Sequence, residues 1–270
     1  MGLRLIGGKG SFLIVSGLIR APSHQGCTAP GGCIGLVAGL LPFEVSREAL
    51  ISALIVLVMA SLPSVAWFFI MRRKMLRRQV YVIRSIEEAV KPRDQRYWVV
   101  GYLVGFTAKY WVKRGHVDKV YVSYTMPPYH AFFYLPVIAI LRRRERLEVA
   151  VEYSRPLGVR GEAHIFDARF RSVRKSVEAD VQQSPYRGRM EGGRLLVAGR
   201  AYEYIGVGEG LQAAKRLIEE LARRAPEVYR VSVIPSRRMI IAVVTPPPSG
   251  VGELLEFLIS WGGVKVESRR

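Results

Sequence analysis

The segment Ala49–Met71 reads A-L-I-S-A-L-I-V-L-V-M-A-S-L-P-S-V-A-W-F-F-I-M and contains no charged residue. As a helix rising about 1.5 Å per residue it would span about 34 Å, and the hydrocarbon core of a bilayer is about 30 Å thick. Pro63 is the one helix breaker, and membrane helices tolerate proline as a kink. The alternative is a buried helix of a soluble protein, but such helices seldom run so far without a charge. We therefore predict one transmembrane helix over residues 49–71.

Basic residues follow this segment directly. Five cations lie within seven positions of its end: Arg72, Arg73, Lys74, Arg77 and Arg78. Before the segment come Glu44, Arg47 and Glu48, which add little positive charge. The positive-inside rule then places the chain after the helix in the cytoplasm and residues 1–48 on the extracytoplasmic side. The five cations are also expected to contact anionic lipid headgroups, each contributing about 1 kcal/mol.

Residues 1–48 contain two apolar stretches, Phe12–Ile19 and Cys33–Phe43, each too short to cross a membrane alone. A cleaved leader and a re-entrant hairpin are the alternatives for this segment. Cys27 and Cys33 are the only cysteines, and they are candidates for a small disulfide or for two thiols in a loop. Because structural zinc usually takes four ligands and no second pair exists, we predict no metal site.

The composition is strongly basic. The formal net charge is +19, the calculated pI is about 10.4 and the mean hydropathy is +0.14. Such a charge favours nucleic acids or anionic lipids, although an arginine-rich coding bias explains it equally well. The chain contains no asparagine. Its absence resembles a thermophile's composition and excludes N-glycosylation.

Residues 72–170 are predicted to form a basic juxtamembrane segment and an α+β domain. Val80–Val90 resembles a short helix closed by Pro92, whereas residues 97–112 fit helix or strand. A second membrane span over Tyr129–Leu141 would place the arginines that follow it on the outside, against the orientation set by the first cluster. We therefore predict a buried strand there, because β-branched and aromatic residues are frequent in it.

Residues 171–193 are polar and end in two glycines, which is typical of a linker. Residues 194–270 then follow the order β-α-β-β-α-β. The expected elements are Arg194–Ile205, Glu209–Arg224, Val228–Ile234, Met239–Val244, a helix from Ser249 through Trp261, and Val264–Glu267. This order resembles the split βαβ unit of ferredoxin-like plaits, which is an architecture and not a family. The predicted fold class is α+β.

Two stretches of the sequence are candidate binding sites. Gly206-Val207-Gly208-Glu209-Gly210 lies between a strand and a helix, but its spacing departs from G-x-G-x-x-G and Glu209 would repel a phosphate, so a flexible turn is the better interpretation. Cations around a tyrosine are typical of single-strand nucleic-acid binders, with a solvated linker as the plainer alternative. The candidate nucleic-acid contacts are Arg171, Arg174, Lys175, Tyr186, Arg187 and Arg189.

Catalytic patterns are lacking in the sequence. The histidines His24, His116, His130 and His164 have no metal-binding spacing, and His164 and Asp167 would lie on opposite faces of a strand. We therefore predict a protein without enzyme activity or cofactor. The expected function is a single-pass membrane protein whose cytoplasmic region binds another protein or itself. The alternative is a membrane-tethered nucleic-acid binder.

Overall fold

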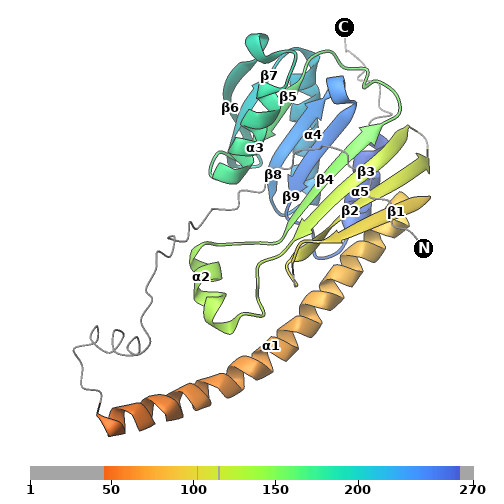
Figure 1. Ribbon diagram of the computed structural model, residues 1–270. Coiled ribbons are helices and arrows are strands. Elements are labelled where there is room, and N and C mark those ends of the chain that lie inside the picture. The colour runs from red at the N-terminus through yellow and green to blue at the C-terminus, as the bar shows by residue number, and fades with distance from the viewer. Residues whose placement is uncertain (1–45, 102, 115, 262–270) are drawn as a thin grey trace, which may run out of the picture. The chain divides into compact units, whose positions relative to one another are not determined.

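The structure is a computed structural model that describes residues 46–101, 103–114 and 116–261 (Figure 1). The chain divides into two compact units, residues 1–54 and 55–270. In the first unit the described residues are the start of the long helix, and the second unit holds the sheet. Cys27, Cys33 and the expected last strand Val264–Glu267 lie outside the described residues.

Helix α1 runs over Arg47–Val90 and is longer than the predicted span. The hydroxyl of Ser46 accepts a hydrogen bond of 3.2 Å from the amide of Ala49, and Glu48 lies in the first turn, where an anion is favoured. The segment Val80–Val90, expected to be a separate helix, is the last part of α1. The helix ends where Lys91 adopts a positive φ of 46°.

Nine strands of the described chain form one antiparallel sheet in the order β1-β2-β3-β4-β9-β8-β5-β7-β6. Their bounds are β1 Asp94–Val99, β2 Gly105–Arg114, β3 Val117–Thr125, β4 Arg146–Tyr153, β5 Ala163–Phe166, β6 Glu191–Val197, β7 Arg200–Gly206, β8 Val228–Ile234 and β9 Met239–Val244. The ambiguous residues 97–112 thus lie in β1, β2 and the turn between them, where Gly101 and Leu103 have positive φ.

Helices cover both faces of this sheet. The other helices are α2 Leu135–Ile140, α3 Arg171–Gln182, α4 Glu209–Arg224 and α5 Val251–Trp261, with short 3-10 turns η1 Phe132–Tyr134, η2 Arg187–Arg189 and η3 Pro235–Arg237. The larger core joins one face to α4, α5 and the C-terminal half of α1. The smaller core joins the opposite face to α3. Successive side chains of β9 point to opposite faces of the sheet and so contribute to both cores: Ala242 faces the larger core and Val243 the smaller one.

The fold is therefore mixed α+β, but the ferredoxin-like unit is not confirmed. The expected strand Arg194–Ile205 is a hairpin, β6–β7, which turns at Ala198 and Gly199 with φ of 48° and 76°. Strand β5 then pairs with both β7 and β8 and separates them. The C-terminal strands thus belong to one sheet with β1–β4, and the expected linker 171–193 contains α3, η2 and the start of β6.

The prediction of a buried strand over Tyr129–Leu141 was wrong. The residues form η1 and α2, a helical excursion between β3 and β4. Pro136 sits in the first turn of α2, where a missing amide hydrogen is tolerated. Several side chains that would have filled a core are exposed, including Phe133 at 71% and Ile140 at 79%.

Candidate membrane interface

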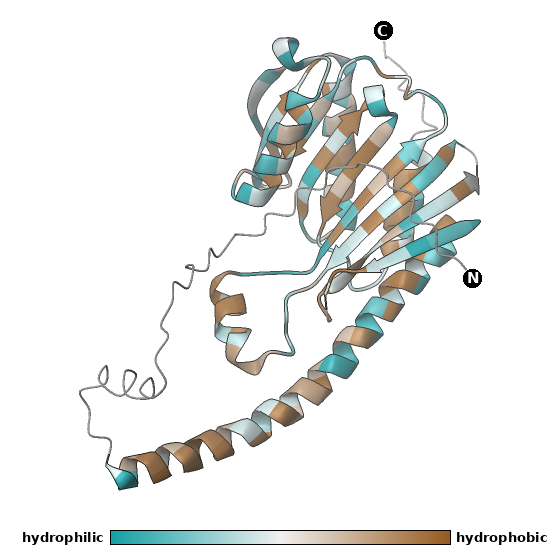
Figure 2. Cartoon of the chain, viewed as in Figure 1, coloured by the Kyte–Doolittle hydropathy of each residue, from teal (hydrophilic) through white to brown (hydrophobic). Residues whose placement is uncertain are grey.

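The first half of α1 is apolar and, except around Trp67 and Phe68, largely uncovered. Among the described residues it is the one helix long and apolar enough to cross a membrane, and none of its most apolar window is buried. Figure 2 shows the apolar colouring of this half, which gives way to mixed colouring farther along the helix. Soluble proteins rarely expose a continuous apolar surface of this size.

The second half of α1 packs against the sheet. Met75, Val82, Ile86 and Ala89 are buried in the larger core, at the spacing that places residues on one helix face. The helix therefore changes its surroundings between Met71 and Met75. The five predicted lipid-contacting cations lie at this change.

These five cations have different surroundings. Arg73, Lys74 and Arg77 are exposed, and Arg72 is half-buried. Arg78 instead bonds to the folded domain: its Nε lies 3.3 Å from Glu145 Oε2, and its terminal nitrogens donate to the carbonyls of Pro248 and Pro247 at 2.8 and 2.9 Å. Arg73, Lys74 and Arg77 are thus exposed, whereas Arg78 ties α1 to the segments that flank β4 and β9.

An open cavity of about 540 Å³ lies beside this cluster. Its lining includes Met71, Lys74, Arg77, Arg78, Tyr129 and Glu145. Glu145 is the acidic group of this lining, and it is held by Arg78 and by the hydroxyl of Tyr124, which donates to it at 2.9 Å. Burial and the Glu145 charge raise the pKa of Tyr124, so this hydroxyl keeps its proton and remains a donor. Lys74 and Arg77 are the other two cations of this lining besides Arg78.

The η1–α2 excursion touches α1 near the end of the apolar segment. The indole Nε1 of Trp67 donates a hydrogen bond of 2.9 Å to the carbonyl of Tyr129. The rings of Trp67 and Phe132 lie 6.0 Å apart, and those of Phe68 and His130 lie 5.8 Å apart, both edge to face. A second hollow, about 680 Å³, lies between Phe68 and Phe69 of α1 and residues 130–134.

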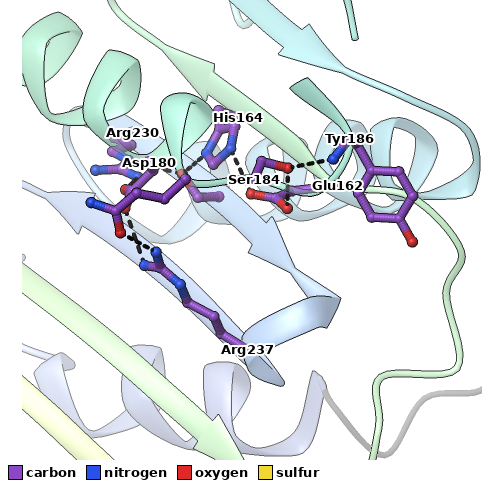
Figure 3. A network of polar contacts seen from close by, with 9 residues as sticks. Glu162, His164, Asp180, Ser184, Tyr186, Arg230 and Arg237 are labelled. Atoms are coloured by element: carbon purple, nitrogen blue, oxygen red, sulfur yellow. Dashed lines mark hydrogen bonds and ion pairs between the residues drawn. The ribbon is translucent and has the colours of Figure 1, made fainter. Parts of the chain in front are cut away.

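The candidate nucleic-acid residues lie on α3 and around η2. Arg171, Arg174, Lys175, Arg187 and Arg189 are exposed, and Tyr186 is half-buried. Arg174 Nε pairs with Glu178 Oε1 at 3.0 Å, which offsets part of this charge. Figure 3 shows the ring of Tyr186 directed away from the neighbouring polar network. One aromatic ring among five cations is a weaker arrangement than a series of stacking rings.

The glycines of Gly206–Gly210 have a packing role. Gly208 adopts φ of 64°, and a Cβ on Gly210 would lie 2.6 Å from the carbonyl oxygen of Gly161. The amide of Gly210 donates to the Arg160 carbonyl at 3.0 Å, and Glu209 Oε2 accepts from the Arg160 amide at 3.1 Å. The turn is therefore fitted against residues 160–161, and its glycines allow this close packing rather than the flexibility that the sequence suggested.

A buried polar network that the sequence did not indicate lies between β5, β8 and α3 (Figure 3). His164 Nδ1 lies 2.9 Å from Ser232 Oγ, and His164 Nε2 lies 3.1 Å from Glu162 Oε1. Ser184 Oγ donates to Glu162 Oε2 at 2.8 Å. Glu162 and His164 are two residues apart and share one face of the chain, so the E-x-H spacing was the available signal. Asp167 is not part of this network: it accepts a hydrogen bond of 2.9 Å from Arg169 Nε rather than from His164.

Arg230 extends the network toward α3. Its Nε donates to Ser232 Oγ at 2.8 Å, a terminal nitrogen donates to Ser176 Oγ at 2.8 Å, and it forms an ion pair with Asp180. The order serine–histidine–glutamate resembles a hydrolase triad in its residue types. However, His164 and Ser232 are fully buried and Glu162 is 1% exposed. A substrate cannot reach this serine in the folded chain, so the network is suited to holding β5, β8 and α3 together.

The described residues contain no cluster of three or more histidine, cysteine or acidic side chains that could hold a metal ion. Neither a protein-family model nor a curated protein matches this chain.

Proposed function

We propose that this chain is a single-pass membrane protein whose α+β domain lies at the cytoplasmic surface, where it binds another protein or a second copy of itself. The observation that carries the proposal is the change along α1 from an uncovered apolar half to a half packed on the sheet. An uncovered apolar helix is stable in hydrocarbon, where its backbone hydrogen bonds are satisfied internally.

Anionic lipid is the expected ligand at the membrane boundary. Arg73, Lys74 and Arg77 are exposed where the apolar segment ends, and Lys74 and Arg77 line the cavity beside α1. Each exposed cation near an anionic surface contributes about 1 kcal/mol. The same charges support the cytoplasmic orientation of the domain.

The protein-binding role is supported by the edge strand β1. Among the described strands it pairs with β2 alone, and Trp98 and Val99 are 51% and 80% exposed. An exposed edge with unpaired backbone groups is a ready template for adding a strand from another chain. A photo-crosslinker at position 98 of the full membrane-bound chain should capture a protein, and Val99→Lys should reduce the capture. Equal capture from exposed position 172 on α3, away from either sheet edge, would count against this edge.

The second candidate is nucleic-acid binding, favoured by the five exposed cations of α3 and η2. Such binding should weaken steeply with salt, because bound phosphates release counterions. Binding of single-stranded DNA that falls strongly between low and moderate salt, and that is lost in Arg187→Ala/Arg189→Ala, would favour this candidate over the first.

A further inference from the structure

The η1–α2 excursion carries no charge between residues 132 and 141, and much of its apolar surface is exposed. Residues 132–141 read F-F-Y-L-P-V-I-A-I-L, and Phe133, Ile140 and Leu141 are 71%, 79% and 53% exposed. Removing apolar surface from water stabilises by about 25 cal/mol per Å². This segment forgoes that stabilisation in water, although the sheet beside it is well packed. Figure 1 shows η1 and α2 standing off the sheet, in the long connection between β3 and β4.

Contacts to α1 fix where this surface lies along the helix. Trp67 bonds to the Tyr129 carbonyl, and its ring meets Phe132. Trp67 precedes Arg72 by five residues, roughly 7 Å along a helix axis. If α1 crosses the membrane, the excursion lies at the depth where the headgroups meet the acyl chains, since interfacial elements insert about 5–10 Å.

Charge at the end of the excursion agrees with that depth. Arg142, Arg143 and Arg144 follow it directly and are exposed, as Arg73 and Lys74 are after the apolar part of α1. Both apolar segments thus end in exposed cations. Cations that follow an apolar segment are typical of chains leaving a bilayer on the side of anionic headgroups.

We propose that residues 132–141 insert into the cytoplasmic leaflet beside α1 as a second, non-spanning membrane contact, with Arg142 and Arg143 among anionic headgroups. Arg144 instead pairs with Glu227 at 3.3 Å. This inference rests on the proposed function, because the depth is set by α1. Lipid is the occupant favoured over a second protein because the surface continues the uncovered apolar segment of α1 through the hollow lined by Phe68, Phe69 and Phe133. The two contacts together would fix the rotation of the domain and α1, as one body, relative to the membrane plane.

Depth-dependent quenching tests the inference. The full chain, with Cys27 and Cys33 replaced by serine, carries one new cysteine labelled with an environment-sensitive fluorophore at position 133 or 140. Position 58 in α1 is the positive control and exposed position 196 on β6 the negative one. The chain is reconstituted in phosphatidylcholine–phosphatidylglycerol vesicles whose acyl chains carry a quencher. Labels at 58, 133 and 140 should emit at shorter wavelength and be quenched, whereas the label at 196 should not.

The other outcomes separate the inference from the anchor. Quenching at 58 but not at 133 and 140 would overturn the leaflet contact and leave the anchor intact. An absence of quenching at all positions would contradict the anchor, and the leaflet contact with it. A short-wavelength emission at 133 that is not quenched, and that disappears when the protein is diluted with lipid, would assign the surface to a second copy and overturn the lipid proposal.

Discussion

The indole of Trp67 in α1 donates a 2.9 Å hydrogen bond to the main-chain carbonyl of Tyr129, 62 residues later in the chain. The bond joins the end of the apolar half of α1 to Tyr129, three residues before η1 begins. It thereby couples the segment proposed to cross the membrane to the segment proposed to rest in one leaflet. A buried or lipid-facing hydrogen bond of this kind contributes about 0.5–1.5 kcal/mol.

Trp67→Phe keeps a ring beside Phe132 but removes this donor. The excursion should then open more often, and trypsin should cleave the detergent-solubilised chain after Arg142–Arg144 about threefold to tenfold faster, as expected for a loss near 1 kcal/mol. Ile70→Val, on an exposed part of α1, is the matched control. Equal cleavage of the two variants would mean that the Trp67–Tyr129 bond does not restrain the excursion.

Arg77 and Arg78 are neighbours with opposite predicted roles. Arg78→Met removes the contacts to Glu145, Pro247 and Pro248, and should lower the free energy of unfolding in urea by about 2 kcal/mol, since these are charge-assisted bonds. Arg77→Met should change unfolding by less than about 0.5 kcal/mol. It should instead reduce retention of phosphatidylglycerol by the solubilised chain about fivefold, as loss of one interfacial cation implies. A reversed pattern would refute this division of the cluster.

Ser232 is predicted to stabilise the fold. Ser232→Ala removes the partner of His164 Nδ1 and of Arg230 Nε inside the protein, and should cost about 2–4 kcal/mol in urea unfolding. Ser172→Ala, at an exposed position of α3, should change the same free energy by less than about 0.5 kcal/mol. If the two alanine variants proved equally stable, the network would not be a source of stability.

Tyrosines packed against α1 predict a loss of stability in alkali. Burial, and then the 2.5 Å hydrogen bond to Glu87, raise the pKa of Tyr97 to about 12. Burial and the bond to Tyr97 raise the pKa of Tyr110 further. Because tyrosines in an unfolded chain titrate near pH 10, the neutral phenols stabilise the fold below about pH 10, and this contribution is lost as the pH rises through about 12.

The melting temperature should therefore fall between about pH 10 and 12, and less steeply in Tyr97→Phe. Tyrosinate absorbance should rise in the same interval, later than in the urea-unfolded chain that serves as the control. Titration of all tyrosines near pH 10 in the folded chain would contradict the assignment of this raised pKa.

The elements that could be predicted are those bounded by local turn residues. The bounds of α4, β8 and β9 match the expected helix Glu209–Arg224 and strands Val228–Ile234 and Met239–Val244. Proline or a glycine-rich turn lies beside each of them. The apolar residues of α4 follow the helical period, and β8 and β9 are short runs rich in β-branched residues. The uncharged run before Arg72 likewise sufficed to predict the apolar half of α1.

Long-range pairing explains what could not be predicted. Strand β5 inserts between β7 and β8, and no local pattern in four residues specifies such partners. The Glu162–His164–Ser232 contacts depend on that insertion. The sequence therefore held only one indication of them, the E-x-H spacing of Glu162 and His164. The prediction for residues 129–141 was wrong for another reason: the same aromatic and β-branched residues that favour a buried strand also occur in the short helical turns η1 and α2.

Membrane topology of the full chain tests the central claim most directly. Two assays compare the native chain with Leu57→Arg/Val58→Arg. In the first, membranes are extracted with alkaline carbonate. In the second, sealed vesicles of either orientation are treated with protease. A truncated control should begin at Arg72, because Met75 and Arg78 belong to the folded domain. The native chain should resist carbonate extraction, and its domain should be digested only in vesicles whose cytoplasmic face is outward. The charged variant and the truncated chain should be released from the membrane by carbonate. A native chain released by carbonate, or a domain digested only from the opposite face, would contradict the proposed anchor or its orientation.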